Sequence, residues 1–185
     1  MTAPIIYVPG FVSNPDEVFA ALWEQLAWEK RADAPRRECW MNDYNAPYTY
    51  GNGDHARTYE AGPWHELITG IRARLLAEHG ADLNCCFVNG YENERQHLGW
   101  HADASKEMSH DHAIAVVSFG AEREIWFREK GTKGHESIGK LLLERGSLLI
   151  MNPGMQLTHE HRIPKASAPC GPRLSLTYRG LLDLS

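Results

Sequence analysis

The sequence lacks the features that would direct it to a membrane or a secretory route. Its amino-terminus, MTAPIIYVPGF, has no basic segment followed by an apolar stretch, so it does not resemble a signal peptide. The longest apolar runs, such as AIAVVSFGA, are too short to cross a bilayer. Internal repeats and low-complexity tracts are also missing. We therefore expect a cytoplasmic protein without a membrane partner.

Cysteine is scarce, and positive charge is not in excess. The four cysteines (Cys39, Cys85, Cys86 and Cys170) form no CxxC motif, which argues against zinc-knuckle and thioredoxin-type sites and favours reduced thiols. The net charge of −5 argues against binding phosphate over the whole surface. A local basic rim and an ordinary solvated face both remain open. The candidates for a rim are Arg36, Arg37, Arg123, Arg128, Lys130, Lys133, Arg162 and Lys165.

The first third of the chain predicts two helices with an irregular segment between them. After a short strand in IIYVPGF, Asn14 and Pro15 suit a helix start, and Val18, Leu22 and Leu26 share one face. A second helix is expected from Pro63 to Gly80, with an apolar stripe of Leu67, Ile68, Ile71, Leu75 and Leu76. Residues 31–62 show little periodicity, and long irregular segments in compact domains are often functional.

The remaining chain predicts β structure. Eight short segments between residues 83 and 180 have strand character: NCCFVNGY, HLGWHAD, AIAVVSFG, EIWFREK, KLLLE, SLLIMN, THEHRI and RLSLTYR. Many short strands at close spacing indicate an antiparallel sandwich or barrel. The length of 185 residues suits one domain. We therefore predict a single α+β, mainly β domain (1–185), with the two helices packed outside one sheet.

One short segment, GWHADAS, contains a candidate metal site. His101 and Asp103 are two residues apart, so in a strand they point to the same side. A third ligand must come from elsewhere, and His159 or His161 in LTHEHRIP can provide it; periodicity does not choose between them. Two histidines and a carboxylate on one side of a metal are typical of non-heme Fe(II). Such a pair also arises by chance on exposed strands.

The last predicted strand has an unusual polar face. In RLSLTYR, one face carries Arg173, Ser175, Thr177 and Arg179, and the other carries Leu174, Leu176 and Tyr178. The arginines are either solvated or point into a barrel. In a barrel they would need anionic partners, such as a dicarboxylate held by the guanidinium groups.

Several motifs in order resemble the AlkB family of Fe(II)/2-oxoglutarate dioxygenases. They are FVNGYENERQHLGWHAD, VVSFGAEREIWFREK, KLLLERGSLLIMN, HRIP and RLSLTYR. The resemblance covers residues 83–180 well and the first 80 residues loosely. It implies a double-stranded β-helix, or jelly roll, as the core at 83–180, with Fe(II), 2-oxoglutarate and the co-substrate O2.

The resemblance also implies roles for individual residues. His101, Asp103 and His161 would bind Fe(II), His161 being preferred because it is followed by Arg162, Ile163 and Pro164. Arg173, with Tyr91 and Ser175, would hold the distal carboxylate of 2-oxoglutarate. Arg179 and Asn89 would hold the carboxylate beside the keto group, with Thr177 as a neighbour. His101, Asp103, His161 and Arg179 are thus the expected catalytic residues.

The expected substrate is an alkylated base in single-stranded nucleic acid, or one flipped from a duplex, as in DNA repair. Residues 31–62 occupy the place of the family's nucleotide-recognition lid. Tyr48 and Tyr50 are the preferred stacking residues, and Trp40 and Tyr44 are further candidates. The alternative is an oxygenase of the same fold that hydroxylates a protein, a small molecule or an unmethylated base. We expect a monomer.

The sequence departs from the family directly after the metal motif. Nucleic-acid repair members usually carry an acidic residue there, which reads the alkylated base. This chain has Ala104 and Ser105, and its next acid is Glu107. Ser105 is therefore a candidate substrate contact, and a neutral base becomes a plausible substrate.

Overall fold

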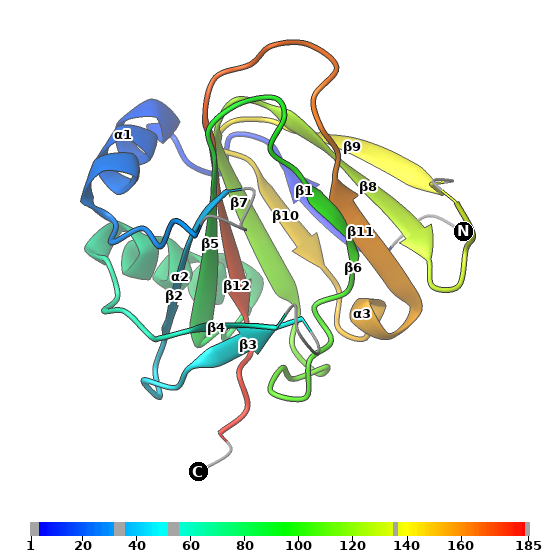
Figure 1. Ribbon diagram of the computed structural model, residues 1–185. Coiled ribbons are helices and arrows are strands. Elements are labelled where there is room, and N and C mark those ends of the chain that lie inside the picture. The colour runs from blue at the N-terminus through cyan, green and yellow to red at the C-terminus, as the bar shows by residue number, and fades with distance from the viewer. Residues whose placement is uncertain (1–3, 32–35, 52–55, 135–136, 184–185) are drawn as a thin grey trace.

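The computed structural model describes residues 4–31, 36–51, 56–134 and 137–183. Two antiparallel sheets form the centre of this part of the chain (Figure 1). The larger sheet has the order β1-β10-β7-β12-β5-β2 and the smaller one β6-β11-β8-β9. The larger comprises β1 (Ile5–Val8), β2 (Arg37–Asn42), β5 (Cys85–Tyr91), β7 (Ile114–Gly120), β10 (Leu148–Met151) and β12 (Arg173–Arg179). The smaller comprises β6 (Leu98–His101), β8 (Arg123–Glu129), β9 (Gly139–Leu143) and β11 (His159–Ile163).

Helices cover one face of the larger sheet, and the smaller sheet covers the other (Figure 1). Helices α1 (Pro15–Gln25) and α2 (Glu66–His79) bury Val18, Leu22, Ile68 and Leu75 against the sheet. A third helix, α3 (Met155–Thr158), is a single turn directly before β11. Within the described residues, none of the helices has the length and apolar character needed to cross a membrane.

All eight segments predicted as strands after residue 83 are strands, from β5 to β12. Strand β12 lies between β7 and β5, and its two faces divide as its sequence alternates. Leu174, Leu176 and Tyr178 pack in the helix-side core. Arg173, Ser175, Thr177 and Arg179 line a cavity between the two sheets, here called the central cavity. The interpretation that the polar face points inward is therefore confirmed.

The prediction of irregular structure at 31–62 is wrong in part. Strand β2 extends the larger sheet, and β3 (Tyr48–Tyr50) pairs with β4 (Arg57–Tyr59) as a separate hairpin. The pattern was obscured because the inward face of β2 carries Glu38, Trp40 and Asn42, an unusual set for a buried strand face. Residues 32–35 and 52–55 of the expected lid lie outside the described residues.

Three details of the helix predictions also change. Asn14 makes no capping hydrogen bond through its side chain, whose amide instead donates to Glu17. Helix α2 begins at Glu66 rather than Pro63, and His65 caps it by accepting from the Leu67 N–H. Leu76 is 50% exposed and does not belong to the buried stripe. Gly80 ends the helix in the left-handed conformation, as predicted.

Two neighbouring leucines of α2 provide a matched test of this packing. Leu75→Ala should lower the free energy of unfolding by about 2–5 kcal/mol, because Leu75 is fully buried. Leu76→Ala should change it by less than about 0.5 kcal/mol, because that side chain is largely solvated. Urea denaturation followed by circular dichroism measures both. Equal losses would contradict the placement of the helix face.

Candidate functional site

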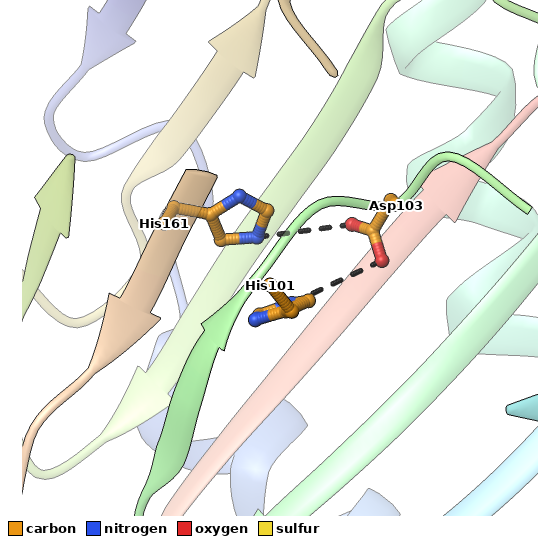
Figure 2. Close-up of side chains that lie close together, drawn as sticks. All are labelled: His101, Asp103 and His161. Atoms are coloured by element: carbon orange, nitrogen blue, oxygen red, sulfur yellow. Dashed lines mark ion pairs between the residues drawn. The ribbon is translucent and has the colours of Figure 1, made fainter. Parts of the chain in front are cut away.

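Two histidines and an aspartate of the central cavity wall lie close together (Figure 2). His101 ends β6, Asp103 follows two residues later, and His161 lies in β11. His101 and His161 are directly paired across the two strands, which puts their rings on the same face. One ligand atom from each residue lies within 4.8 Å of the others. The His101 Nε2–Asp103 Oδ1 and His161 Nε2–Asp103 Oδ2 distances are 4.0 and 3.8 Å.

Both imidazoles have the protonation state that a metal ligand needs. Burial is the main cause that lowers the pKa of His101, and it lowers the pKa of His161 to about 3, with His101 as a further cause. Both rings are therefore neutral at physiological pH. His101 Nδ1 lies 2.9 Å from the Gly99 carbonyl oxygen, which can only accept. The proton is thus on Nδ1, and Nε2 keeps its lone pair for a metal.

Asp103 is held charged and oriented from two sides. Burial alone would raise its pKa, but Arg179 and then the two histidines outweigh it and the pKa is lowered. Arg179 Nη1 donates to Asp103 Oδ1 at 3.1 Å. The Asp103 backbone N–H donates to Oε1 of Gln156 in α3 at 2.9 Å. The chain therefore presents a buried, ionised carboxylate between two neutral imidazoles, a donor set that suits Fe(II).

His159 lies outside this group, although it shares the strand face of His161. Its Nδ1 is 2.8 Å from Thr158 Oγ1, and it pairs with Glu129 at the far end of β11. Only His161 among these two lines the central cavity. Strand periodicity did not distinguish His159 from His161, but only His161 is close to His101 and Asp103.

Arg173 lies in the central cavity with donors that have no partner. It is 1% exposed, and its Nη2 donates to Ser118 Oγ at 3.0 Å. Its Nε and Nη1 have no hydrogen-bond partner among the described residues. Burial lowers its pKa to about 10, which still leaves it charged at neutral pH. A buried guanidinium with two unmet donors requires an anion, and a carboxylate meets that need.

The other residues expected to bind 2-oxoglutarate lie around Arg173. Asn89 and Ser175 are paired across β5 and β12, and the Tyr91 ring lies 5.2 Å from the Arg173 guanidinium carbon. All three line the central cavity, as does Thr177. Asn89 Oδ1 accepts from Arg36 Nε at 2.6 Å, so its amide group remains as a donor. The cavity wall thus fits a dicarboxylate along β12.

Two charged residues of the cavity wall were not predicted as site residues. Arg36 and Glu38 form an ion pair with Nη2 and Oε1 2.7 Å apart, and Glu38 Oε2 accepts from the Tyr59 hydroxyl at 2.5 Å. The alternation of Glu38, Trp40 and Asn42 in RECWMN is the signal that could have revealed an inward polar face. Gln156, which fixes Asp103, has no comparable signal in the sequence.

The expected base-stacking residues divide into three groups. Tyr48 and Tyr50 line the central cavity, and the Tyr50 and His101 rings meet edge to face at 6.4 Å. Burial, and then Asp103, raise the pKa of Tyr50 to about 12, so its hydroxyl stays protonated. Trp40 is 1% exposed and packs beneath Tyr48, so its expected stacking role is corrected to a core role. Tyr44 is 44% exposed and does not line the cavity.

Ser105 lies at the mouth of the site, in a hollow beside the Tyr50–His101 ring pair. This entrance hollow is lined by residues 48–51, 101, 102 and 104–107. Ser105 Oγ is buried and has no hydrogen-bond partner among the described residues. Ser105 therefore has an unused polar group beside the hollow.

The basic rim is smaller than its sequence candidates suggested. Arg36 and Arg123 are buried, and Arg123 donates to the backbone carbonyls of Gln96 and Pro164. Arg128 and Arg162 lie over the Trp100 ring at 4.4 and 4.9 Å. Arg37 is half-buried and pairs with Glu92, whereas Lys130, Lys133 and Lys165 are exposed.

Comparison with known proteins gives the class. Residues 18–179 match the profile of the 2OG-Fe(II) oxygenase superfamily. The solved structure of OsALKBH1 superposes with a TM-score of 0.67 at 16% identity, covering 97% of this chain and 99% of that one, which shows a shared fold. Membership of this superfamily brings Fe(II) and 2-oxoglutarate as cofactors and O2 as co-substrate, and the histidines, Asp103 and Arg173 fit them.

The curated relatives narrow the class. DNA oxidative demethylase ALKBH2 of Homo sapiens is 31% identical over an alignment of 186 residues that covers 92% of this chain and 70% of that protein. Alpha-ketoglutarate-dependent dioxygenase alkB homolog 3 of Bos taurus is 31% identical over 188 residues, covering 92% of this chain and 64% of that protein. The chain belongs to the AlkB-like 2-oxoglutarate oxygenases. It spans about two thirds of the length of these relatives.

The two histidines of β11 allow a matched test of the metal site. His161→Ala should weaken Fe(II) binding by at least about 100-fold, beyond the 10- to 100-fold typical of losing an outer hydrogen-bond partner. His159→Ala should bind Fe(II) like the unaltered protein, because its ring lies away from Asp103. Anaerobic calorimetric titration measures both. Loss of binding in His159→Ala alone would mean that the wrong histidine has been assigned.

Arg173 is tested by separating cofactor binding from stability. Arg173→Met should weaken 2-oxoglutarate binding by at least about 100-fold, because a buried carboxylate loses its partner. It should not lower the free energy of unfolding of the cofactor-free protein, since it removes a buried, incompletely paired charge.

Arg123→Met is the matched control for Arg173→Met. Arg123 is equally buried, but it donates to backbone carbonyls and does not line the cavity. Its loss should destabilise the protein and spare 2-oxoglutarate affinity. Thermal unfolding and equilibrium titration distinguish the two variants, and the reverse pattern would contradict the assignment.

Proposed function

We propose that this protein is an Fe(II)/2-oxoglutarate-dependent dioxygenase that removes methyl groups oxidatively from nucleobases. One observation carries the proposal: His101, Asp103 and His161 share a cavity with the incompletely paired guanidinium of Arg173. The names of the relatives, which include DNA oxidative demethylases, support the choice of substrate. Nucleic acid is accordingly the proposed partner.

The overall reaction consumes one 2-oxoglutarate and one O2 for each methyl group. One oxygen atom enters succinate as CO2 leaves, and the other becomes a hydroxyl on the methyl carbon. The resulting N–CH2OH group loses formaldehyde and leaves an N–H. The bound iron supplies the O2 activation, and the protein provides position and exclusion of water.

The chain's own side chains account for binding and orientation. Arg173, assisted by Ser175 and Tyr91, receives the distal carboxylate of the keto acid. Arg179 and the Asn89 amide receive the carboxylate beside the keto group, with Thr177 alongside. Arg179 also fixes Asp103 through its 3.1 Å contact, so the same group orients a metal ligand and the cofactor.

The β3–β4 hairpin is the proposed nucleotide-recognition lid, within the 31–62 segment. Tyr50 from this hairpin and His101 from β6 provide two rings beside the entrance hollow, where a flipped or single-stranded base can lie. Tyr48 holds Arg179 from the same hairpin, at 3.4 Å from Nη1. Ser105 is the proposed contact to the base edge.

The finer architecture follows from the same proposal. We infer a single domain over residues 1–185 whose two sheets form a double-stranded β-helix, or jelly roll, at 83–180. The two N-terminal helices pack on the larger sheet of this core. A cytoplasmic, monomeric protein is consistent with the four free cysteines, Cys39, Cys85, Cys86 and Cys170.

The second candidate is a hydroxylase of the same chemistry acting on a protein, a small molecule or an unmethylated base. The neutral pair Ala104 and Ser105 favours it, because no carboxylate follows Asp103 to read an alkylated base. Mass-shift screening of peptides and cell extracts with the loaded protein would reveal such a substrate.

Turnover of methylated oligonucleotides tests the proposed activity. The Fe(II)- and 2-oxoglutarate-loaded protein should release formaldehyde, and His101→Ala should abolish the release because it removes a metal ligand. His159→Ala should retain it. Absence of turnover on every methylated DNA and RNA tested, with both cofactors bound, would defeat demethylation and leave the hydroxylase alternative.

A further inference from the structure

The charges on the wall of the central cavity are almost fully paired. Its three arginines are Arg36, Arg173 and Arg179, and its two carboxylates are Glu38 and Asp103. Arg36 pairs with Glu38 at 2.7 Å, and Arg179 pairs with Asp103 at 3.1 Å. Among the charged residues of the wall that the structure describes, only Arg173 has no ion-pair partner. Fe(II) and the 2-oxoglutarate dianion cancel each other, so the loaded cavity keeps one net positive charge.

This charge lies close to the rings that would hold the base. Tyr50 and His101, whose rings meet edge to face at 6.4 Å, line the same cavity as Arg36 and Arg179. A cationic base beside these two rings would be repelled by the net positive charge of the loaded cavity. The Glu38 carboxylate is not available to attract a cationic base, because its two oxygens already contact Arg36 and the Tyr59 hydroxyl.

The entrance hollow adds no unpaired negative charge. Ala104 and Ser105 are neutral, and Glu107 is its single acid in the part of the chain described. Lys106 is its single lysine or arginine in the part of the chain described, and Lys106 Nζ lies 4.0 Å from Glu107 Oε1, so these two side chains together add no net charge. A hydrogen-bond donor is present instead, in the Ser105 hydroxyl. Such a donor matches a carbonyl oxygen on a base.

We propose that this cavity selects uncharged methylated bases over cationic ones. The favoured substrates carry the methyl group on a ring nitrogen flanked by carbonyl oxygen, as in 3-methylthymine, or beside one, as in 1-methylguanine. The disfavoured ones are 1-methyladenine and 3-methylcytosine, which are positively charged. The inference rests on the proposed demethylase function and adds the class of base that the site accepts.

Four single-stranded oligonucleotides that differ only in the methylated base test this selectivity. The loaded protein should show kcat/KM for 3-methylthymine and 1-methylguanine at least about tenfold above the two cationic bases, an electrostatic preference of modest size. Mass spectrometry of the products and formaldehyde release measure it. Equal or faster turnover of the cationic bases overturns the inference and leaves the demethylase function intact. No turnover of any of the four also overturns the inference, and the wider panel of methylated DNA and RNA then decides the demethylase function.

Paired substitutions at Ser105 test the physical cause. Ser105→Asp should raise the ratio of cationic to neutral turnover by about tenfold, because it adds a carboxylate at the base. The nearly isosteric Ser105→Asn should leave this ratio unchanged. Anaerobic fluorescence anisotropy of the same oligonucleotides should show the same change in relative affinity. Equal ratios in the two variants would overturn the electrostatic explanation.

Substitutions at Glu107 and Ala104 test the other residues of the entrance hollow that could affect the charge preference. Glu107→Gln should leave the ratio unchanged, and a selective loss of cationic substrates in it would mean that Glu107 reads a positive base, against the proposal. Ala104→Asp and Ala104→Asn repeat the charge comparison if a Ser105 variant fails to fold, as judged by thermal unfolding. The expected and contradicting results are the same as for Ser105.

Discussion

The ion pair between Arg179 and Asp103 joins the two halves of this molecule. Arg179 belongs to the larger sheet, and Asp103 follows the edge strand of the smaller one. The guanidinium lies among the rings of Trp40, Tyr48 and Phe87, where an unpaired charge would be costly. Arg179 also lowers the pKa of the Asp103 carboxyl, which favours its ionised form. The same contact therefore links the two sheets and orients the carboxylate proposed as a metal ligand.

Much of the β core could be predicted from the sequence, because strand periodicity is local. The alternation in RLSLTYR separates a face against the helices from a face in the cavity, and the pairing of β12 with β5 and β7 follows that division. Two of the proposed metal ligands, His101 and Asp103, were predicted for the same reason, and the structure places them beside His161. Distinguishing His161 from His159 required the register of β11 against β6, which is a tertiary property.

The amino-terminal part was less predictable, because its polar residues have buried partners distant in sequence. Strand β2 carries Glu38 inward, which is tolerable only because Arg36 and Tyr59 meet it there. Trp40 was predicted to stack on a base, but it is buried and its ring packs against Tyr48. In both cases local composition indicated irregular structure, whereas pairing of β2 with β5 buries these side chains.

The direct pairing of His101 with His161 has a consequence for folding. Their rings, 4.2 Å apart, face the cavity only in one register of β6 against β11. A shift by one residue would turn one ring to the opposite face of the sheet and separate the two. An ion that uses both imidazoles would therefore bind only the correctly paired chain. Its binding energy would then favour this strand alignment over slipped ones.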